Sequence, residues 1–436
     1  MNRIRYAWRQ LLPRAVLIVV MPMLGGGMSV AFAQMAQYST PQQQSIPTPQ
    51  SQPAQTETVR PEIALVVMGA QELMSTQKFQ EALAKVREGD RVADRTGFED
   101  FVLDQIRGLA AARAGDLPTA TKSYEAVVAS GRLARTDQLK VVEVLAQLYF
   151  EAKDYPKAAT WSARYVTEGG TDPQTRLLRV RSLYLAEDFA GAAAELRASV
   201  AADEKAGIAP PLSRLQLLAS CYVKLKDDAG YVSTLEKLLA YYPNKDYWAD
   251  AIRRVETRAG FADRLRLDAL RLRHATGTLN GAAQYAAMVQ LALNAGFPAE
   301  AKRIADLGFS SGLLGTGADV DLQKRLRDMA TKQAAEDENL LTQNAASAGA
   351  AKDGTALVNV GYAFVSSGQF DKGLALMEQG LQKGGIARLD DAKLHLAIAY
   401  LAAGQKAKAT AMFKDVQGSD GAADLARLWL IQAQRS

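Results

Sequence analysis

The stretch Gly368–Gly380 reads GQFDKGLALMEQG and places Gly373 three residues after the aromatic Phe370, inside a helical pattern. Glycine costs a helix interior about 1 kcal/mol relative to alanine, so a packing demand must favour such a small side chain there. The close approach of a second helix is such a demand, because ridge-in-groove packing then brings two backbones together. The stretch therefore predicts a tightly packed helical hairpin.

The same junction, a turn followed by a small residue, recurs along the chain. The small residues that end it are Ala82, Ala120, Ala158, Ala192, Gly373 and Ala409. Successive steps are 38, 38 and 34 residues for the first four and 36 for the last pair. Weaker members fall at Tyr231, Leu265 and Ala301, of which the first two are too large for a close crossing. Apolar residues recur at spacings of three and four from Pro61 onward, so the period indicates an array of helical hairpins.

These residues resemble the tetratricopeptide repeat, a helix-turn-helix unit, over roughly residues 61–417. The positions that carry the resemblance are Gly361, Phe364, Gly368, Phe370, Gly373 and Met377, then Ala397, Tyr400, Gly404, Ala409 and Phe413, and also Leu218, Ala219, Tyr222 and Pro243. The resemblance implies an all-α, right-handed superhelical solenoid of about nine helix pairs, with a capping helix over 421–434 that covers the last apolar edge. The alternative is an unrelated all-helical bundle.

The pattern divides the chain after residue 60 into three parts. We predict an N-terminal solenoid segment over 61–310, a connector or degenerate repeat over 311–350, and C-terminal repeats with the capping helix over 351–436. No turn interrupts 319–346, so this stretch is either a degenerate unit or one long helix. The glycine-rich loop 308–317 would then be a hinge, and it lacks the Gly-Lys-Ser/Thr of a phosphate loop.

The first 60 residues carry export and spacer signals. Residues 1–33 hold four arginines, no acid, an apolar middle and small residues before Gln34. This pattern predicts a secretory signal peptide cleaved after Ala33, and hence a periplasmic or secreted protein. The alternative is a retained membrane anchor, but Pro22 and three glycines interrupt the apolar run. Gln, Pro, Ser and Thr fill 19 of the 27 positions of 34–60, which predicts a disordered linker.

Charge and cysteine content exclude several function classes. The chain has 52 basic and 47 acidic residues, and the leader contributes four of the basic ones, so the remainder is nearly neutral. Nucleic-acid binding, which needs a basic stripe, is therefore not expected. The single cysteine, Cys221, cannot form an intrachain disulfide and is predicted to be a small buried hydrophobe. No integral membrane segment is expected once the leader is removed.

No catalytic or metal-binding constellation stands out in the sequence. The two histidines, His274 and His395, fall in different repeats, and neither lies at metal-ligand spacing from a Cys, Asp or Glu. No serine lies in a G-x-S-x-G elbow. We therefore predict a non-enzymatic protein that needs no cofactor and no metal.

The resemblance implies that the first helix of each pair lines a concave groove with the stripe not used for packing. At spacings of three and four, that stripe comprises Lys140, Glu143, Gln147 and Glu151, then Gln174, Arg181 and Tyr184, then Gln216, Ser220 and Lys224, then Tyr247, Asp250, Arg254 and Arg258, and finally Gln290 and Asn294. Long polar side chains mixed with tyrosine suit an extended peptide or partner helix. A solvated face would have much the same composition.

Residues 245–275 are rich in arginine, with seven arginines and one lysine against five acids. Arginine suits bidentate capture of carboxylate or phosphate, so the segment offers an alternative ligand, an anionic one such as an exported polysaccharide. The other interpretation is an exposed helix laced with ion pairs, such as Asp268 with Arg264 and Arg271.

The expected function is a protein–protein interaction scaffold. Exported members of the family tend to work in envelope assemblies, so the resemblance implies a bacterial cell-envelope protein that binds a partner protein along the groove. The sequence leaves open the partner, the face that binds it and the oligomeric state.

Overall fold

The computed structural model describes residues 57–435. The predicted signal peptide and nearly all of the predicted linker lie outside the described residues. Within that range every regular element is helical, and no strand is present. The all-α prediction is therefore confirmed.

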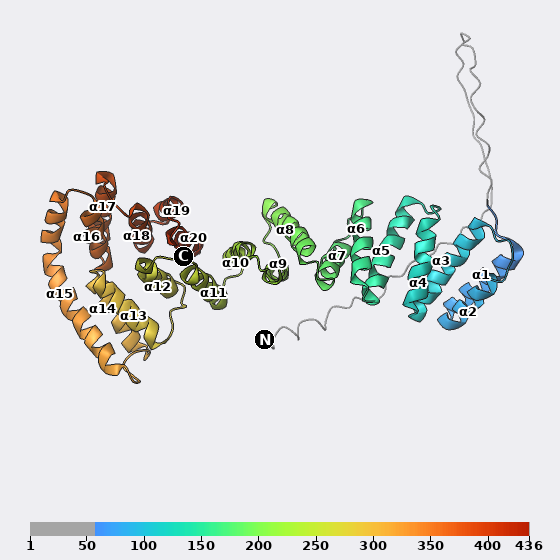
Figure 1. Ribbon diagram of the computed structural model, residues 1–436, viewed down its shortest axis with the longest axis horizontal. Coiled ribbons are helices and arrows are strands. Elements are labelled where there is room, and N and C mark those ends of the chain that lie inside the picture. Colours follow the sequence, from blue (N-terminus) through green and yellow to red (C-terminus); the bar gives the residue numbers. More distant parts are fainter. Residues whose placement is uncertain (1–56, 436) are drawn as a thin grey trace, which may run out of the picture. The chain divides into compact units, whose positions relative to one another are not determined.

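Within residues 57–435, twenty α-helices and one 3-10 turn follow one another (Figure 1). The helices are α1 (Pro61–Ser75), α2 (Phe79–Gly89), α3 (Gly97–Ala114), α4 (Leu117–Ala129), α5 (Arg135–Glu151), α6 (Tyr155–Thr167), α7 (Pro173–Leu185), α8 (Phe189–Lys205), α9 (Leu212–Leu225), α10 (Asp228–Tyr241), α11 (Lys245–Thr257), α12 (Arg266–Ala275), α13 (Gly281–Asn294), α14 (Pro298–Ser310), α15 (Val320–Ala350), α16 (Thr355–Ser366), α17 (Phe370–Lys383), α18 (Leu389–Ala402), α19 (Lys406–Lys414) and α20 (Ala422–Ala433). The 3-10 turn η2 (Asp263–Leu265) leads into α12.

Consecutive helices pack as nine hairpins. The pairs are α1/α2, α3/α4, α5/α6, α7/α8, α9/α10, α11/α12, α13/α14, α16/α17 and α18/α19, whereas α15 and α20 stand outside them. Hairpins also pack on their neighbours, for example α6 on α7 and α8 on α9. A helical-repeat fold with about nine pairs is thus what the sequence period predicted.

The turns inside the early hairpins repeat one local geometry. A residue in the left-handed region is followed by an aspartate whose side chain accepts a backbone N–H at the start of the second helix. These residue pairs are Gly115–Asp116, Lys153–Asp154, Glu187–Asp188 and Lys226–Asp227. Asp satisfies a backbone donor that the helix start would otherwise leave unpaired, so each turn is encoded locally.

Hairpin α16/α17 explains why a glycine stands at position 373. A Cβ added to Gly373 would lie 2.6 Å from the carbonyl oxygen of Gly361, and one added to Gly361 would lie 2.7 Å from that of Gly373. Gly354 and Gly380 approach one another in the same way. The two backbones therefore meet along the crossing, and the predicted close approach is confirmed.

This crossing gives a test with a matched control. Gly373→Ala is expected to destabilise the protein by about 1–3 kcal/mol, because the new methyl group overpacks the crossing. Gly349→Ala in α15, where an added Cβ meets nothing within 4 Å, is expected to stabilise it by up to about 1 kcal/mol through helix propensity. Urea denaturation of both variants measures the two effects. A stability gain in Gly373→Ala would contradict the packing interpretation.

The two oversized members of the repeat pattern have different explanations. In α9/α10 the small slot is taken by Gly230, one residue before Tyr231, and a Cβ added there would lie 2.4 Å from a ring carbon of Tyr222. Leu265 lies in the 3-10 turn before α12 and is buried, so it is not a crossing residue of a second helix. Cys221 is fully buried in α9, as predicted, and burial raises the pKa of its thiol to about 11.

The stretch predicted as a connector or degenerate repeat forms one helix. After the loop that follows α14, α15 runs for 31 residues without a break. It packs against α13 and α14, which precede it in the chain, and against α16, which follows it. Leu326, Ala330, Leu341 and Ala348 are its buried apolar residues. Of the alternatives that the sequence left open, the structure has the single long helix.

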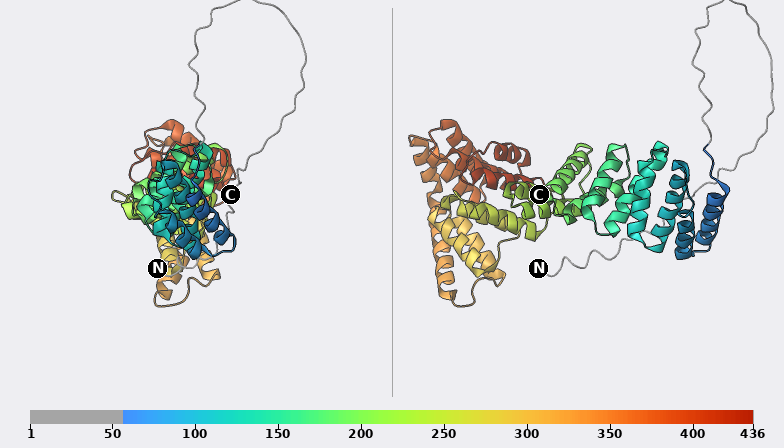
Figure 2. Two further views of the ribbon diagram at one scale, coloured as in Figure 1. Left: turned by 90° about the vertical axis from the view of Figure 1, so that its right-hand side faces the viewer. Right: turned by 45° about the vertical axis from the view of Figure 1, so that its right-hand side comes forward.

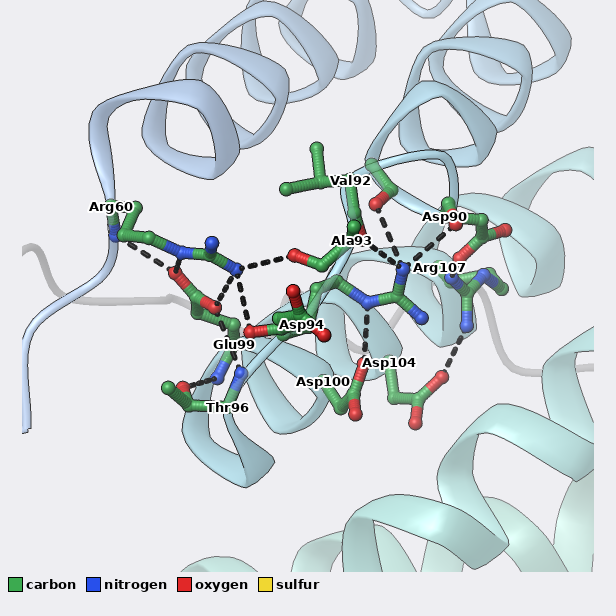
Figure 3. Close-up of polar contacts among 12 residues, drawn as sticks. Arg60, Asp90, Val92, Ala93, Asp94, Thr96, Glu99, Asp100, Asp104 and Arg107 are labelled. Atoms are coloured by element: carbon green, nitrogen blue, oxygen red, sulfur yellow. Dashed lines mark hydrogen bonds and ion pairs between the residues drawn. The ribbon is translucent and has the colours of Figure 1, made fainter.

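The folded region begins before the predicted boundary at Pro61. Figure 3 shows Arg60 clamped on Glu99, whose side chain is fully buried near the start of α3. Arg60 donates through Nε at 2.9 Å and Nη2 at 2.8 Å, and its backbone N–H bonds the same carboxylate at 3.0 Å. The Arg60 side chain, with backbone donors of Thr96 and Arg60, lowers the pKa of Glu99 to about 2. Arg60 therefore belongs to the fold rather than to the linker.

The last helix closes the C-terminal half onto the middle of the chain. α20 packs on α18 and α19, and also on α10, α11 and α12 (Figures 1 and 2). Arg427 reaches Glu236 of α10 at 3.2 Å, and Gln432 donates to the carbonyl of Ala275 at 3.3 Å. The prediction that this helix covers only the last apolar edge is therefore incomplete. One apolar cluster accordingly runs from Val180 to Ala433.

Candidate functional site

Side chains of successive first helices bond to one another across one face, which we call the first-helix face. It is formed by the outward stripes of α5, α7, α9 and α11. The hydroxyl of Thr175 donates to Glu143 at 3.0 Å, which links α7 to α5. The hydroxyls of Tyr184 and Ser220 lie 2.7 Å apart and link α7 to α9. The predicted stripes of neighbouring repeats thus lie side by side.

A third link extends this face to α11, where the amide of Gln216 donates to the hydroxyl of Tyr247 at 3.1 Å. Beside it, Asp250 accepts from the hydroxyl of Tyr231 at 2.9 Å, and the guanidinium of Arg254 stacks over the Tyr231 ring at 4.1 Å. Burial alone would raise the pKa of Asp250, but hydrogen bonds from Tyr231 and Arg253 and the charge of Arg254 lower it. This end of the face is therefore an organised polar cluster.

Other predicted residues of the face are exposed. They are Lys140, Gln147 and Glu151 of α5 and Lys224 of α9, whereas Arg181 of α7 is half-buried. Lys140 pairs with Asp137 at 3.0 Å on its own helix, and Lys224 lies over the ring of Phe189 at 5.9 Å. Exposed ion pairs of this kind contribute little to stability. These side chains can therefore exchange their contacts for those of a ligand.

Three predicted residues lie outside this arrangement. Arg258 donates to Asp424 of α20 at 2.5 Å and to the carbonyl of Ser419. It therefore holds the closure, by which we mean the packing of α20 on α10, α11 and α12. Gln290 and Asn294 are exposed on α13 and bond to each other at 2.9 Å. No hydrogen bond in the described part of the chain joins this α13 pair to α5, α7, α9 or α11.

The predicted stripes do not include the apolar residues of the first-helix face. Leu177 of α7 is 38% exposed, and Leu212 and Val223 of α9 are 37% and 55% exposed. Leu177 lies four residues before Arg181, and Leu212 four before Gln216, so helical spacing places them on the predicted stripes. The sequence signal that could have identified these residues is an apolar residue on the helix stripe that is not used for packing. The face therefore combines hydrogen-bonding groups with exposed aliphatic side chains.

Most of the arginine-rich segment is engaged inside the protein. Arg264 donates to Asp391 at 2.7 Å and also pairs with Asp420, and Arg273 pairs with Glu256 at 2.5 Å. Arg271 is buried and bonds Glu300 and Asp268. The interpretation of α12 as an exposed helix laced with ion pairs is therefore wrong: Arg271 does pair with Asp268, but seven consecutive residues of α12 are buried.

The histidines take different places. The Nε2 atom of His395 on α18 lies 3.0 Å from the carboxylate of Asp268, and His274 lies at the end of α12. Burial, assisted by the charge of Arg303, lowers the pKa of His274. Residues 57–435 contain no cluster of three or more His, Cys, Asp and Glu side chains placed to hold a metal ion. No helix in that range is long and apolar enough to cross a membrane.

Comparison with known families identifies the repeat. The sequence model of the family described as "Tetratricopeptide repeat" matches residues 215–245, which cover most of α9, all of α10 and the turn between them. The chain therefore contains a tetratricopeptide repeat at these residues. The matched unit contains Leu218, Ala219, Tyr222 and Pro243, four of the residues on which the resemblance was drawn.

Several solved structures are similar to this chain at low sequence identity. Naa15/Naa10 bound to HypK-THB is 16% identical, with 81% of this chain and 58% of that chain covered and a TM-score of 0.30. This chain therefore spans less than two thirds of that one. A tetratricopeptide repeat protein from Parabacteroides merdae is 11% identical, covering 76% and 98%, with a TM-score of 0.27. Yeast Tom70 is 12% identical, covering 86% and 95%, with a TM-score of 0.24.

A search of curated proteins found no match.

Proposed function

We propose that this protein is a non-enzymatic scaffold that binds a partner protein along the first-helix face of α5, α7, α9 and α11. The observation that carries the proposal is the continuity of that face. Side-chain hydrogen bonds link Glu143, Thr175, Tyr184, Ser220, Gln216 and Tyr247 across four successive first helices. Tetratricopeptide repeats generally act as protein-binding scaffolds, which supports the same reading.

The composition of the face suits a partner segment with both apolar and polar side chains. The exposed Leu177, Leu212 and Val223 offer aliphatic surface that becomes favourable when a partner removes it from water. Glutamine, lysine and glutamate around them can bond a partner backbone or its charged groups. The fixed spacing of the first helices presents these groups at regular intervals to an extended peptide or a helix.

The location proposed for this work is the cell envelope of a bacterium. The support is the leader-like sequence of residues 1–33, followed by the Gln- and Pro-rich stretch 34–60. An exported scaffold tethered by such a spacer would act in the periplasm or outside the cell. Signal-peptide cleavage after Ala33 is testable by N-terminal sequencing of the protein recovered from cells.

The partner-binding test introduces a photocrosslinking residue at Gln147 or Val223 in living cells, followed by identification of what is captured. Lys122 of α4 and Arg197 of α8 are matched control positions, because both are exposed on second helices. We expect one protein to be captured from both positions on the face and not from the controls.

A charge-introducing variant then tests whether the face itself binds. Leu177→Asp combined with Val223→Asp is expected to weaken binding of the captured protein at least about tenfold, because each aspartate must be desolvated in the interface. The thermal stability should stay unchanged, since both leucine and valine side chains are exposed. Equal capture at control positions, or unaltered affinity of the double variant, would contradict the proposal.

Binding of an anionic polysaccharide by the arginine-rich segment is less well supported, because several of its guanidinium groups are committed to carboxylates of α14, α18 and α20. Replacing Arg258 by glutamate would also place a carboxylate against Asp424 and disturb the closure. Arg254→Glu alone avoids that disturbance. It should abolish retention of an anionic polysaccharide, whereas protein capture by the more N-terminal part of the first-helix face should largely survive.

A further inference from the structure

A cavity of about 420 Å³ lies where the C-terminal half closes on itself. Its walls come from α12, α13, α14, α16, α17, α18 and α20, so no single hairpin forms it. Its volume falls at the lower end of the range for small-molecule sites, about 300–1,000 Å³. Arg303 and Phe370 of its lining are exposed, which places them at the solvent side of the cavity.

Three hydrogen-bond donors that line this cavity have no acceptor in the described part of the chain. The indole Nε1 of Trp429 is buried and has no hydrogen-bond partner, and the residue as a whole is only 5% exposed. The hydroxyl of Tyr362 and the guanidinium of Arg303 also form no hydrogen bond or ion pair there. Of the three donors, only the Nε1 atom of Trp429 is a fully buried atom without a partner, whereas Arg303 is exposed. A buried donor without an acceptor is costly, so native proteins rarely keep one without a reason.

The charges around the cavity favour an anion. Arg271 is neutralised by Glu300, to which it donates through Nε at 2.9 Å and Nη2 at 2.6 Å. Arg271 also bonds the buried carboxylate of Asp268, which lies outside the lining, at 2.7 Å. Among the lining residues, Arg303 is the cation without a carboxylate partner. Burial raises the pKa of Tyr362 and lowers that of His274, so the first stays a neutral donor and the second a neutral imidazole at pH 7. An acceptor with negative charge would meet two neutral donors and one cation.

The rest of the lining is mostly apolar, and its polar members are Ser366 and Gln432. The apolar members are Met288, Val365, Phe370, Ile398, Leu401 and several alanines. The apolar side chains offer no hydrogen bonds to a ligand. A ligand that fills the cavity must therefore carry an apolar body as well as its acceptor group.

We infer that this cavity is a binding site for a small amphipathic organic anion, of which a medium-chain carboxylate is the simplest example. The carboxylate accepts from Arg303, Tyr362 and Trp429, and the hydrocarbon chain packs on the apolar walls. Because these three residues belong to α14, α16 and α20, and α14 already packs on α16, a bound anion ties α20 to that pair. The ligand therefore stabilises the closure as well as occupying it.

The test is calorimetric titration of the full mature chain with sodium octanoate, and with 1-octanol as the uncharged match. Octanoate is expected to bind with micromolar to low-millimolar affinity and to raise the melting temperature, and octanol to bind at least about tenfold more weakly. Decanoate compared with octanoate shows whether the hydrocarbon chain is buried, because each added methylene should strengthen binding.

Two variants assign the anion to its donors. Arg303→Gln and Tyr362→Phe are each expected to weaken octanoate about tenfold, because each removes a hydrogen bond to a charged group. Arg266→Gln is the matched control, since Arg266 is an exposed arginine of α12 that does not line the cavity. Circular dichroism melting checks that each variant is folded.

Several results would overturn the inference. They are the absence of octanoate binding, equal binding of octanoate and octanol, and unchanged octanoate affinity in a folded Arg303→Gln variant.

Discussion

Arg271→Met is expected to lower the free energy of unfolding by about 3–5 kcal/mol, because it leaves two buried carboxylates without their cation. The Arg271 and Glu300 side chains are each 4% exposed, and that of Asp268 is 3% exposed. Arg271 bonds Glu300 in bidentate fashion and donates its remaining Nη1 to Asp268 at 2.7 Å. Methionine keeps an apolar chain of similar length, so the expected loss reflects charge rather than a large cavity.

The loss should depend on pH in a defined direction. Burial alone would raise the pKa of Asp268, but His395 and Arg271 lower it to about 2. Its unfolded pKa is about 3.9, so this carboxylate stabilises the fold above that value and loses its contribution as the pH falls toward 2. In the variant, protonation relieves the unpaired carboxylates. The stability difference between wild type and Arg271→Met should therefore narrow below a pH of about 4.

Urea denaturation at neutral and acidic pH measures both effects. Arg327→Met is the matched control, because Arg327 pairs with Asp306 at 2.8 Å with 45% of its side chain exposed. Such surface pairs contribute about 0–1 kcal/mol, so the control should lose little. Similar losses in the two variants, or a difference that widens in acid, would contradict the role given to the buried cluster.

A chain that ends after Gln417 should lose the structure of the helices that α20 contacts, whereas the N-terminal hairpins should stay folded. The truncation removes α20 with its buried Leu425, Leu428 and Trp429, and burial of each such side chain contributes about 1.5–3 kcal/mol. It also removes the ion pair from Arg258 to Asp424. Because each hairpin of a repeat protein contacts mainly its neighbours, the damage should stay local.

Hydrogen exchange read by mass spectrometry is the measurement. Amides of α10, α11, α12, α18 and α19 should exchange much faster in the truncated chain, whereas those of α1 to α6 should keep their protection. Arg258→Met keeps the apolar contacts of α20 and serves as the milder control, with a smaller change at the same helices. Unaltered protection at α11 and α12 would mean that α20 does not hold the closure.

The hairpins were predictable because their determinants are local. Gly373, Phe370 and the turn before them lie within one unit, and packing inside that unit already demands the small residue. The predicted polar stripe was recoverable for the same reason, since residues three and four apart share a helix face. The exposed Leu177 and Val223 were not separated from packing residues, because sequence spacing does not tell which apolar side chains a neighbouring repeat covers.

The amino-acid order determines the repeat period and the helix content, because short-range sterics and helical periodicity decide both. For the same reason it determines the outward position of Glu143, Tyr184 and Tyr247. It does not determine the closure, in which α20 packs on α10, α11 and α12. Asp268 meets His395 across 127 residues, and Arg258 meets Asp424 across 166. Contacts between residues so far apart produce no periodic pattern in the sequence. A charged residue is the same letter whether water or a distant helix surrounds its side chain. The fold therefore decides which arginines are buried partners, and where the C-terminal half encloses a cavity.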